Sequence, residues 1–294
     1  MAGGYIDGQL FGEKQKARAS EGTRLREMEG LASQDGAPIL KVYGRVRIGG
    51  QLIRGTRFEE RATTTIRKAA ASGGKGAPSR PASVKERSDS YSVNLAIGLC
   101  EGPIALVRRV WADGREVDLT RVTMRVSTGD SGQQPDALII AKEGAGQAPA
   151  YRGTAYVIFE RFPLASYGNR VPQFSFEVVQ ALPGLGAQVR SVNLVPGSSE
   201  FAYEPANVTR PFGMGNSAPE NRHQLQVASD VLASLDQLQA LYPGLASVQI
   251  VVSWFGDDLR VGHCTTSPRV DSAIKVTSGA TWGWPALPAP MPGW

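Results

Sequence analysis

The chain has 294 residues, of which 41% are hydrophobic, and a formal net charge of +5 at pH 7. This length is enough for two domains with ordinary hydrophobic cores. No apolar run reaches the roughly 18 residues of a membrane-spanning helix, and Met1 to Arg18 lack the apolar core and cleavage site of a signal peptide. The two cysteines, Cys100 and Cys264, can form at most one disulfide, so we expect assembly in a reducing cytoplasm.

The basic excess is concentrated in residues 1–90, and residues 91–294 are slightly acidic. A solvated basic surface explains this distribution, and so does contact with DNA or with an acidic neighbour. The charge alone leaves both explanations open.

Residues 1–35 form a helix-prone segment. The stretches Glu13–Arg18 and Arg24–Glu29 are rich in good helix formers. Apolar residues such as Leu10 and Phe11 are too sparse for a stable isolated helix, so we expect the segment to need a partner surface.

Residues 36–182 are predicted to be rich in β-strands. Ile39–Ile48 is typical of a strand, and Gln51–Phe58 is predicted to return as its hairpin partner across the intervening Gly-Gly pair. Residues 62–90 then lose all apolar periodicity and are basic, so we expect a mobile loop there.

Strands with frequent turns continue beyond that loop. In Tyr91–Cys100 every second residue is apolar, which predicts a half-buried antiparallel strand. Ile104–Trp111 is predicted as the next strand, and Asp113-Gly114 as the tight hairpin turn after it.

The last part of this region is rich in aromatic and β-branched residues. Tyr151–Glu160 and Gln173–Val178 are predicted strands, separated by the turn dipeptide Gly168-Asn169. Upstream, Ala137–Ala141 is a short apolar piece between polar loops. Six or more short strands with frequent turns predict a β-barrel or sandwich, so the expected fold class is mainly β with α+β elements.

A second region is predicted over 186–270, after a Pro-Gly boundary. Ser217 to Glu220 is a helix-start signal, and apolar residues then recur at helical spacing as far as Leu241. Val248 to Trp254 alternates as a buried strand would, so helix and strand form one unit of an α/β layer. Residues 271–294, rich in proline and tryptophan, are predicted to be an irregular tail.

Two acidic residues and a His-Cys pair are the candidates for catalysis or metal binding. Asp257 and Asp258 follow the predicted strand, but adjacent residues of an extended chain point to opposite sides, whereas glycoside hydrolysis needs two opposed carboxylates. His263 and Cys264 have one other histidine and one other cysteine in the whole chain, without the paired spacing of a zinc site. Structural roles are favoured for all four, and we expect no catalytic site, cofactor or metal.

Four stretches, in the same order, resemble the tail-tip (baseplate hub) proteins of siphophages and gene transfer agents. They are 36–45 with "GAPI" and "VYGR", Tyr91–Ile104 with "YSV" and "LCEGPI", 111–114 with "WADG", and Pro149–Val178 with "AYRGTAYVIFERFPLASYGNRVPQFSFEV". In addition, "SVQIVVSWFGDDLRVGHC" resembles the start of a TIM-barrel-like domain related to glycoside hydrolases. Family members are usually far longer, so the chain is expected to be an N-terminal portion, a shortened homologue or a truncated product.

The resemblance implies a structural virion protein rather than an enzyme. In that family the hub is a trimer around a β-barrel that closes the tail tube and gates DNA release. Implied partners are other hub subunits in a homotrimer, the distal tail tube, neighbouring baseplate proteins, DNA in the tail lumen and, indirectly, the host cell envelope. The implied location is the virion tail tip, after assembly in the host cytoplasm.

Interface candidates are the arginines beside the family stretches, because arginine is favoured at interfaces, and the sparse apolar residues of the N-terminal segment. They are Leu10, Phe11, Arg108, Arg109, Arg152 and Arg170. Solvated charge at strand edges is the alternative explanation for the arginines.

Two other functions remain open from the sequence. One is a cell-wall glycoside hydrolase of the tail tip, with a TIM-barrel-like catalytic domain. The other is a non-specific DNA-binding module based on the basic N-terminal third, whose retention on DNA would weaken steeply with salt.

Overall fold

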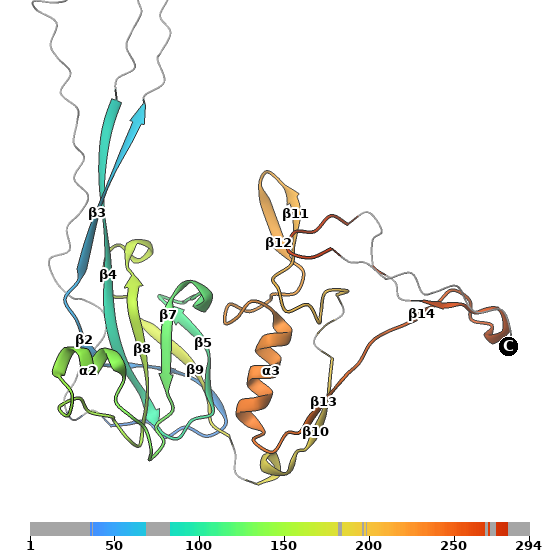
Figure 1. The fold of residues 1–294 in the computed structure, drawn as a ribbon, viewed down its shortest axis with the longest axis horizontal. Helices are drawn as coiled ribbons and strands as arrows, with labels where there is room; N and C mark the ends of the chain where they lie inside the picture. The colour runs from blue at the N-terminus through green and yellow to red at the C-terminus, as the bar shows by residue number, and fades with distance from the viewer. Residues whose placement is uncertain are drawn as a thin grey trace, which may run out of the picture.

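The computed structural model describes residues 36, 38–68, 83–181, 184–195, 197, 199–267, 270 and 275–281. The helix-prone segment, with Leu10 and Phe11, and residues 282–294 of the predicted tail lie outside the described residues. The fold is mainly β, as predicted. Figure 1 shows a β-sheet body and, beside it, a C-terminal unit that begins after residue 184. None of the described helices has the length and apolar character of a membrane span.

The β-sheet body is a sandwich of two antiparallel sheets, one of the two architectures predicted. The first sheet has the order β1 (Arg45–Gly49), β9 (Phe174–Val179), β5 (Leu106–Ala112) and β6 (Arg115–Glu116). The second has the order β2 (Gln51–Gly55), β4 (Ser83–Glu101), β8 (Thr154–Pro163) and β7 (Thr123–Ser127), with β3 (Glu59–Lys68) also paired to β4.

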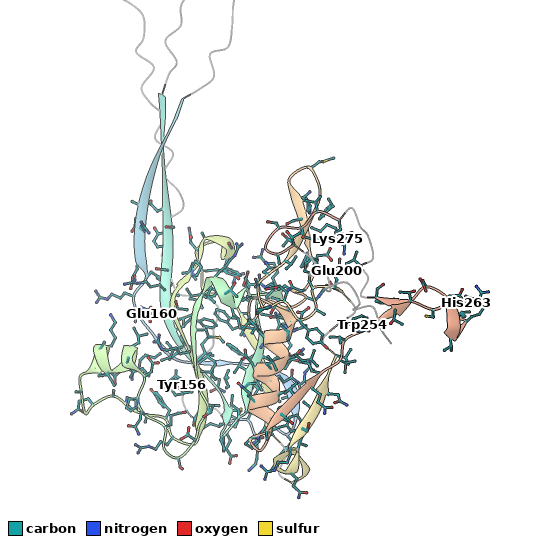
Figure 2. All side chains as sticks on the ribbon, turned by 45° about the vertical axis from the view of Figure 1, so that its right-hand side comes forward. Tyr156, Glu160, Glu200, Trp254, His263 and Lys275 are labelled. Carbon is teal, nitrogen blue, oxygen red and sulfur yellow. The ribbon has the colours of Figure 1, made fainter. Side chains whose placement is uncertain are left out.

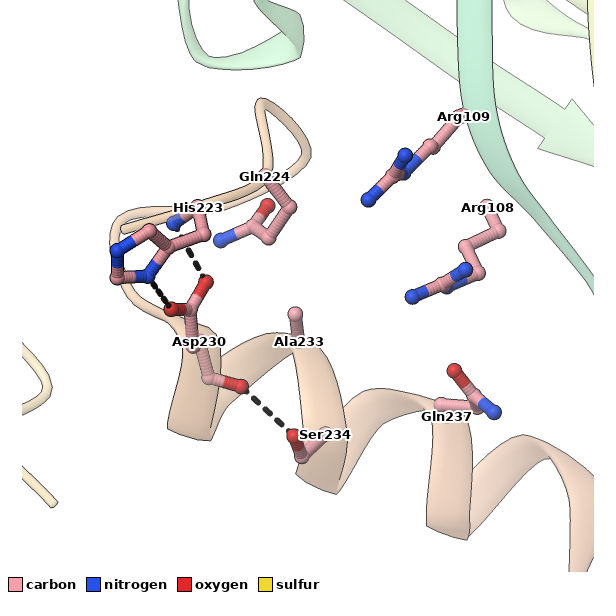
Figure 3. Close-up of a pocket in the computed structure, with 8 residues that line it drawn as sticks. All are labelled: Arg108, Arg109, His223, Gln224, Asp230, Ala233, Ser234 and Gln237. Atoms are coloured by element: carbon pink, nitrogen blue, oxygen red, sulfur yellow. Dashed lines mark hydrogen bonds and ion pairs between the residues drawn. The ribbon is translucent and has the colours of Figure 1, made fainter. Parts of the chain in front are cut away.

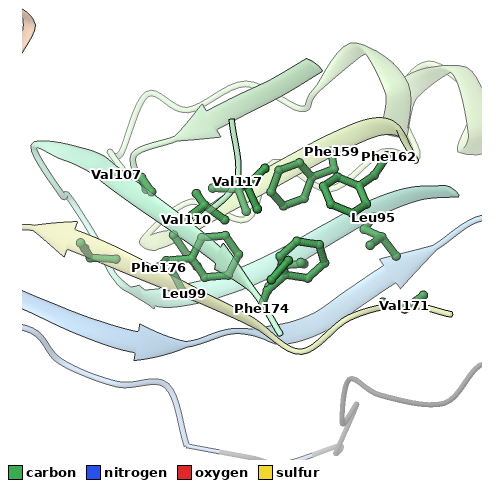
Figure 4. Close-up of a cluster of buried hydrophobic side chains, with 14 of the residues drawn as sticks. Leu95, Leu99, Val107, Val110, Val117, Phe159, Phe162, Val171, Phe174 and Phe176 are labelled. Atoms are coloured by element: carbon green, nitrogen blue, oxygen red, sulfur yellow. The ribbon is translucent and has the colours of Figure 1, made fainter. Parts of the chain in front are cut away.

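An aromatic core joins the two sheets (Figure 4). Phe159 and Phe162 come from β8, and Phe174 and Phe176 from β9; all four are fully buried. The ring of Phe159 stacks on that of Phe174 at 4.9 Å between centroids, and Phe162 meets Phe174 edge to face at 5.0 Å. Aromatic pairs at these distances add to the stability gained from burial alone.

Between Tyr91 and Cys100 both faces of β4 are largely buried, so the prediction of a half-buried strand there is wrong. Its alternate apolar residues do point into the core, as expected. On the opposite face, Ala96 packs with Tyr156, Ile158 and Ile139. Ile139 belongs to a helix, α2 (Ala137–Glu143), which the short apolar piece forms and which covers this face.

The predicted hairpin across the Gly-Gly pair is also wrong. β1 pairs with β9 and β2 pairs with β4, so the chain passes from one sheet to the other at Gly50. A Cβ atom on Gly50 would overlap Ile97 and lie 3.0 Å from Phe176. Glycine is needed here because the backbone crosses close above the core, not because it turns tightly. By contrast, Asp113 and Gly114 both have positive φ and form the predicted turn between β5 and β6.

Much of the region predicted as a mobile loop is strand. β3 and β4 pair without interruption from Glu59↔Ser92 to Lys68↔Ser83, and Figure 1 shows this ribbon projecting from the sandwich. The three consecutive threonines at 63–65 are β-branched and favour strands without apolar alternation. Residues 69–82, the centre of the predicted loop, lie outside the described residues.

An ion pair fixes the start of α2. Asp136 caps the helix by accepting from the Leu138 backbone N–H at 2.8 Å and accepts two hydrogen bonds from Arg125, at 2.7 and 2.9 Å. Burial raises the pKa of Asp136, but the bonds from Arg125 and Leu138 more than offset this, so its pKa lies below the usual value.

Acid should therefore remove this contribution. A carboxyl group with a lowered folded-state pKa stabilises the fold above its unfolded pKa of about 3.9, and this stabilisation is lost as the pH falls through the folded-state pKa. Asp136→Ala should lower the free energy of unfolding by about 1–2 kcal/mol at pH 7 and by less at pH 3. Urea unfolding at both pH values tests this, with the exposed Asp236→Ala as control. A difference that is equally large at pH 3 would refute the assignment.

The C-terminal unit contains a parallel strand–helix–strand arrangement, in agreement with the predicted α/β element. β10 (Ser191–Leu194) pairs in parallel with β13 (Ser247–Ile250), and α3 (Asp230–Leu241) lies between them in the chain. In Figure 1, α3 lies between the sandwich on one side and these two strands on the other. The remaining strands are β11 (Thr209–Gly213), β12 (Asn216–Pro219), β14 (Phe255–Gly256) and β15 (Thr266–Ser267).

Helix α3 begins at Asp230, ten or more residues later than the predicted start. The supposed start signal at Ser217–Pro219 pairs instead with β11. After β12, the buried Asn221, which is 2% exposed, holds the chain in a non-helical conformation. Its side chain accepts from the Val208 N–H and donates to the Glu204 carbonyl, each at 2.8 Å. These bonds compete with helix formation in the residues before α3.

A buried cluster of three charged side chains joins separate segments of this unit. Lys275 contacts Glu200 at 2.9 Å and Glu220 at 3.0 Å, and all three side chains are less than a tenth exposed. Figure 2 shows Lys275 close to Glu200. The cluster attaches residues 275–281 to the rest of the unit. If this segment moved away, Glu200 and Glu220 would lose their ion pairs with Lys275, and leaving a buried charge unpaired is costly.

Candidate assembly interface

The C-terminal unit carries a run of apolar side chains that are about half or more exposed among the described residues. The strand predicted as buried ends at Ile250, and Ile250, Val251, Val252 and Phe255 are 60%, 45%, 64% and 49% exposed. The prediction of a buried strand is wrong because β10 and β13 have no further strand beside them in the described part of the chain, whereas parallel strands are normally covered on both faces. We call Ile250–Phe255 the C-terminal apolar surface. A contiguous exposed apolar surface is typical of an interface.

Beyond this surface the chain leads to an outlying hairpin, β14–β15. Figure 2 shows Trp254 at its near end and His263 at its far end. Asp257 accepts from the Thr265 N–H at 2.7 Å, and Asp258 binds the Arg260 guanidinium at 2.6 Å, which lowers the pKa of Asp258. Both carboxylates thus have the turn roles that the sequence favours. Among the described residues there is no metal-ligating cluster.

The sandwich also has an edge strand with no neighbour among the residues that the structure describes. This strand is β1, in the first sheet, and Val46 within it is 39% exposed. The segment before it exposes Ile39 at 61% and Tyr43 at 71%. Unpaired edge strands are templates for pairing with another chain.

Two of the predicted interface arginines fix turns of their own chain. Arg152 donates to the Gln133 carbonyl at 3.1 Å, and Arg170 binds Asp113 at 2.7 Å. Asp113 also accepts from the Gln173 N–H at 2.9 Å, so Arg170 supports the turn after β5. These contacts leave an interface role for both arginines a prediction.

The other two arginines lie side by side at a cavity between β5 and α3 (Figure 3). Arg108 is 3.5 Å from Glu177, and Arg109 is 3.6 Å from Glu116. The cavity has a volume of about 200 Å³. Its lining comprises Arg108, Arg109, His223, Gln224, Asp230, Ala233, Ser234 and Gln237.

Sequence reasoning missed Arg222, which joins the C-terminal unit to the sandwich. Its guanidinium donates to Asp118 at 2.7 Å and to the Val227 carbonyl at 3.0 Å. Nearby, the Leu119 N–H donates to the Leu225 carbonyl at 2.8 Å. No local motif could have revealed this contact, because its two sides are about a hundred residues apart in the chain.

Neither a protein-family model nor a curated protein matches the chain. Among solved structures, it is similar to a chain in the virion of a native gene transfer agent particle, with 40% sequence identity and a TM-score of 0.40. The match covers 58% of this chain and 33% of that chain, so this chain spans about a third of its length.

Proposed function

We propose that the chain is a structural virion protein that forms the hub at the distal tip (baseplate) of a siphophage-type tail. In this role it closes the tail tube and gates the release of DNA. The sequence similarity to a chain of a gene transfer agent virion accords with this proposal.

The observation that carries the proposal is that the four stretches resembling tail-tip proteins bond directly to one another. The Glu101 N–H donates to the Leu40 carbonyl at 2.7 Å, which joins the first stretch to the second. The Gly102 N–H donates to Gly153 at 2.9 Å, which joins the second to the fourth, and the Asp113 N–H donates to Gln173 at 3.0 Å, which joins the third to the fourth. The four stretches are therefore neighbours in one folded body, although they are separated in the sequence.

Three features of the described residues would let this body assemble with neighbours. They are the open edge of β1, the projecting β3–β4 ribbon and the C-terminal apolar surface. We assign the C-terminal apolar surface to contact between copies of this chain in a homotrimer. The ribbon and the edge are assigned to the tail tube and neighbouring baseplate proteins.

The oligomeric state of the purified chain tests this assignment. Sedimentation should find a trimer that Ile250→Asp combined with Val252→Asp disrupts, because burying two new charges at the contact is costly. The matched control is Phe212→Asp combined with Met214→Asp, whose side chains are also exposed, at 64% and 103%. A monomer at all concentrations, or equal loss of the trimer in both double variants, would refute the assignment.

A catalytic role receives no separate support from the site. Asp257 and Asp258 are both engaged within their own hairpin, and the opposed pair of carboxylates that glycoside hydrolysis needs is not found at this position. Hydrolysis of purified peptidoglycan by the chain would favour the enzyme over the hub.

A further inference from the structure

Arg108 and Arg109 are neighbours in a strand, yet both reach the same cavity. Consecutive strand residues normally point to opposite faces of a sheet. Here the pairing of β5 with β9 shifts its register between Val107 and Val110. Such an irregularity redirects a side chain, and Figure 3 shows both guanidinium groups directed toward α3.

The positive charge of this pair is only partly balanced. Glu177 is shared, because it forms a closer contact with Arg45 than the 3.5 Å contact with Arg108. The Nε of Arg109 is 3.6 Å from Oε1 of Glu116, so the two groups form an ion pair, but neither atom has a hydrogen-bond partner among the described residues. Burial, and next the charge of Arg45, lower the pKa of Arg108, so an added negative charge would be favourable there.

The opposite wall of the cavity is polar. Gln237 brings a side-chain amide to the lining that can donate hydrogen bonds. The amide of Gln224 already donates to the Val227 carbonyl at 3.2 Å, which leaves it one further N–H to donate. The acidic residue of the lining, Asp230, is already engaged, since it accepts from the backbone N–H of His223 at 2.8 Å and contacts its ring nitrogen at 2.7 Å. These contacts direct the Asp230 carboxylate toward His223 and away from the arginines, while its negative charge remains in the lining (Figure 3).

We propose that this cavity binds a phosphate-sized oxyanion, held between the arginines of β5 and the amides beside α3. Guanidinium groups bind phosphate oxygens with geometric specificity, which suits a pair of arginines directed into one space. The volume of about 200 Å³ accommodates such an ion with a few water molecules, but it is smaller than the cavities of roughly 300–1,000 Å³ that hold larger ligands. The bound ion links the sandwich to the C-terminal unit.

Isothermal titration calorimetry of the full chain with inorganic phosphate tests this proposal. Titration with sodium chloride at matched ionic strength is the reference. We expect saturable binding of one phosphate per chain. Arg109→Gln should weaken it by about tenfold or more, because a charged bidentate donor is lost. Arg121→Gln, at an 84% exposed arginine outside the cavity, should leave the dissociation constant unchanged.

A second variant separates loss of the site from loss of the fold. Ala233→Leu fills the cavity from α3 without changing any charge, and leucine is a good helix former. Phosphate binding should be lost while the far-ultraviolet circular dichroism stays that of the wild type. No binding beyond the chloride reference, unchanged binding by Ala233→Leu, or equal weakening by Arg109→Gln and Arg121→Gln would each overturn the proposal. None of these results depends on the hub role.

Discussion

Replacement of Phe159 by alanine is expected to lower the free energy of unfolding by about 3–5 kcal/mol, the range for removing a buried aromatic ring. Phe159 is fully buried, and its ring contacts Phe162, Phe174 and Phe176. The loss has two parts: the apolar burial of the ring, and the cavity that the rigid neighbouring rings cannot close. Urea unfolding followed by circular dichroism measures it.

The control is Phe212→Ala, at a phenylalanine that is 64% exposed in β11. Its effect should stay within about 0.5 kcal/mol, as is usual for surface substitutions. A similar loss in both variants would mean that Phe159 is not central to the core.

Replacement of Gly129 by alanine should cost about 2–4 kcal/mol, through strain and overpacking together. Gly129 has a φ of +86°, which disfavours any residue with a Cβ atom. An added Cβ would also lie 2.8 Å from the Ala155 nitrogen and from the Gly102 Cα. These are backbone atoms, so they cannot rotate away as the end of a side chain could.

Gly153→Ala separates the two causes, because Gly153 has a similar φ of +81° with nothing within 4 Å of an added Cβ. This variant should lose about 1 kcal/mol, from the backbone conformation alone. The difference between the two variants, read from thermal and urea unfolding, is the cost of the close approach. Equal losses would show that the segments around Gly129 can move apart.

The parts of the fold that the sequence could predict are those governed by local patterns. The inward direction of alternate residues in Tyr91–Cys100 and the Asp-Gly turn after β5 depend on neighbouring residues, and the structure confirms both, whereas burial of the other face of that strand is not predicted. Strand partners could not be predicted in the same way. The Gly-Gly pair looks like a hairpin turn, and only the packing of Ile97 and Phe176 above Gly50 shows that the chain changes sheets there.

Burial depends on which elements meet, and this also limited the prediction. The β4 face that carries Ala96 is covered by α2, while Ile250 and Val252 are exposed because β13 has one strand neighbour among the described residues. At the cavity, the sequence predicts Arg108 and Arg109 as interface residues from their place beside the family stretches. Both side chains point to the same side because the pairing of β5 with β9 shifts its register, and the pattern of apolar residues in the sequence does not predict such a shift.

Antibody-gold labelling of purified particles, viewed by electron microscopy, tests the hub proposal most directly. The antibody is raised against the sandwich, and particles that lack the chain serve as the negative control. The proposal predicts label at the distal tip of the tail. Label along the tail or on the head, or unlabelled particles while the chain accumulates in soluble form, would contradict it.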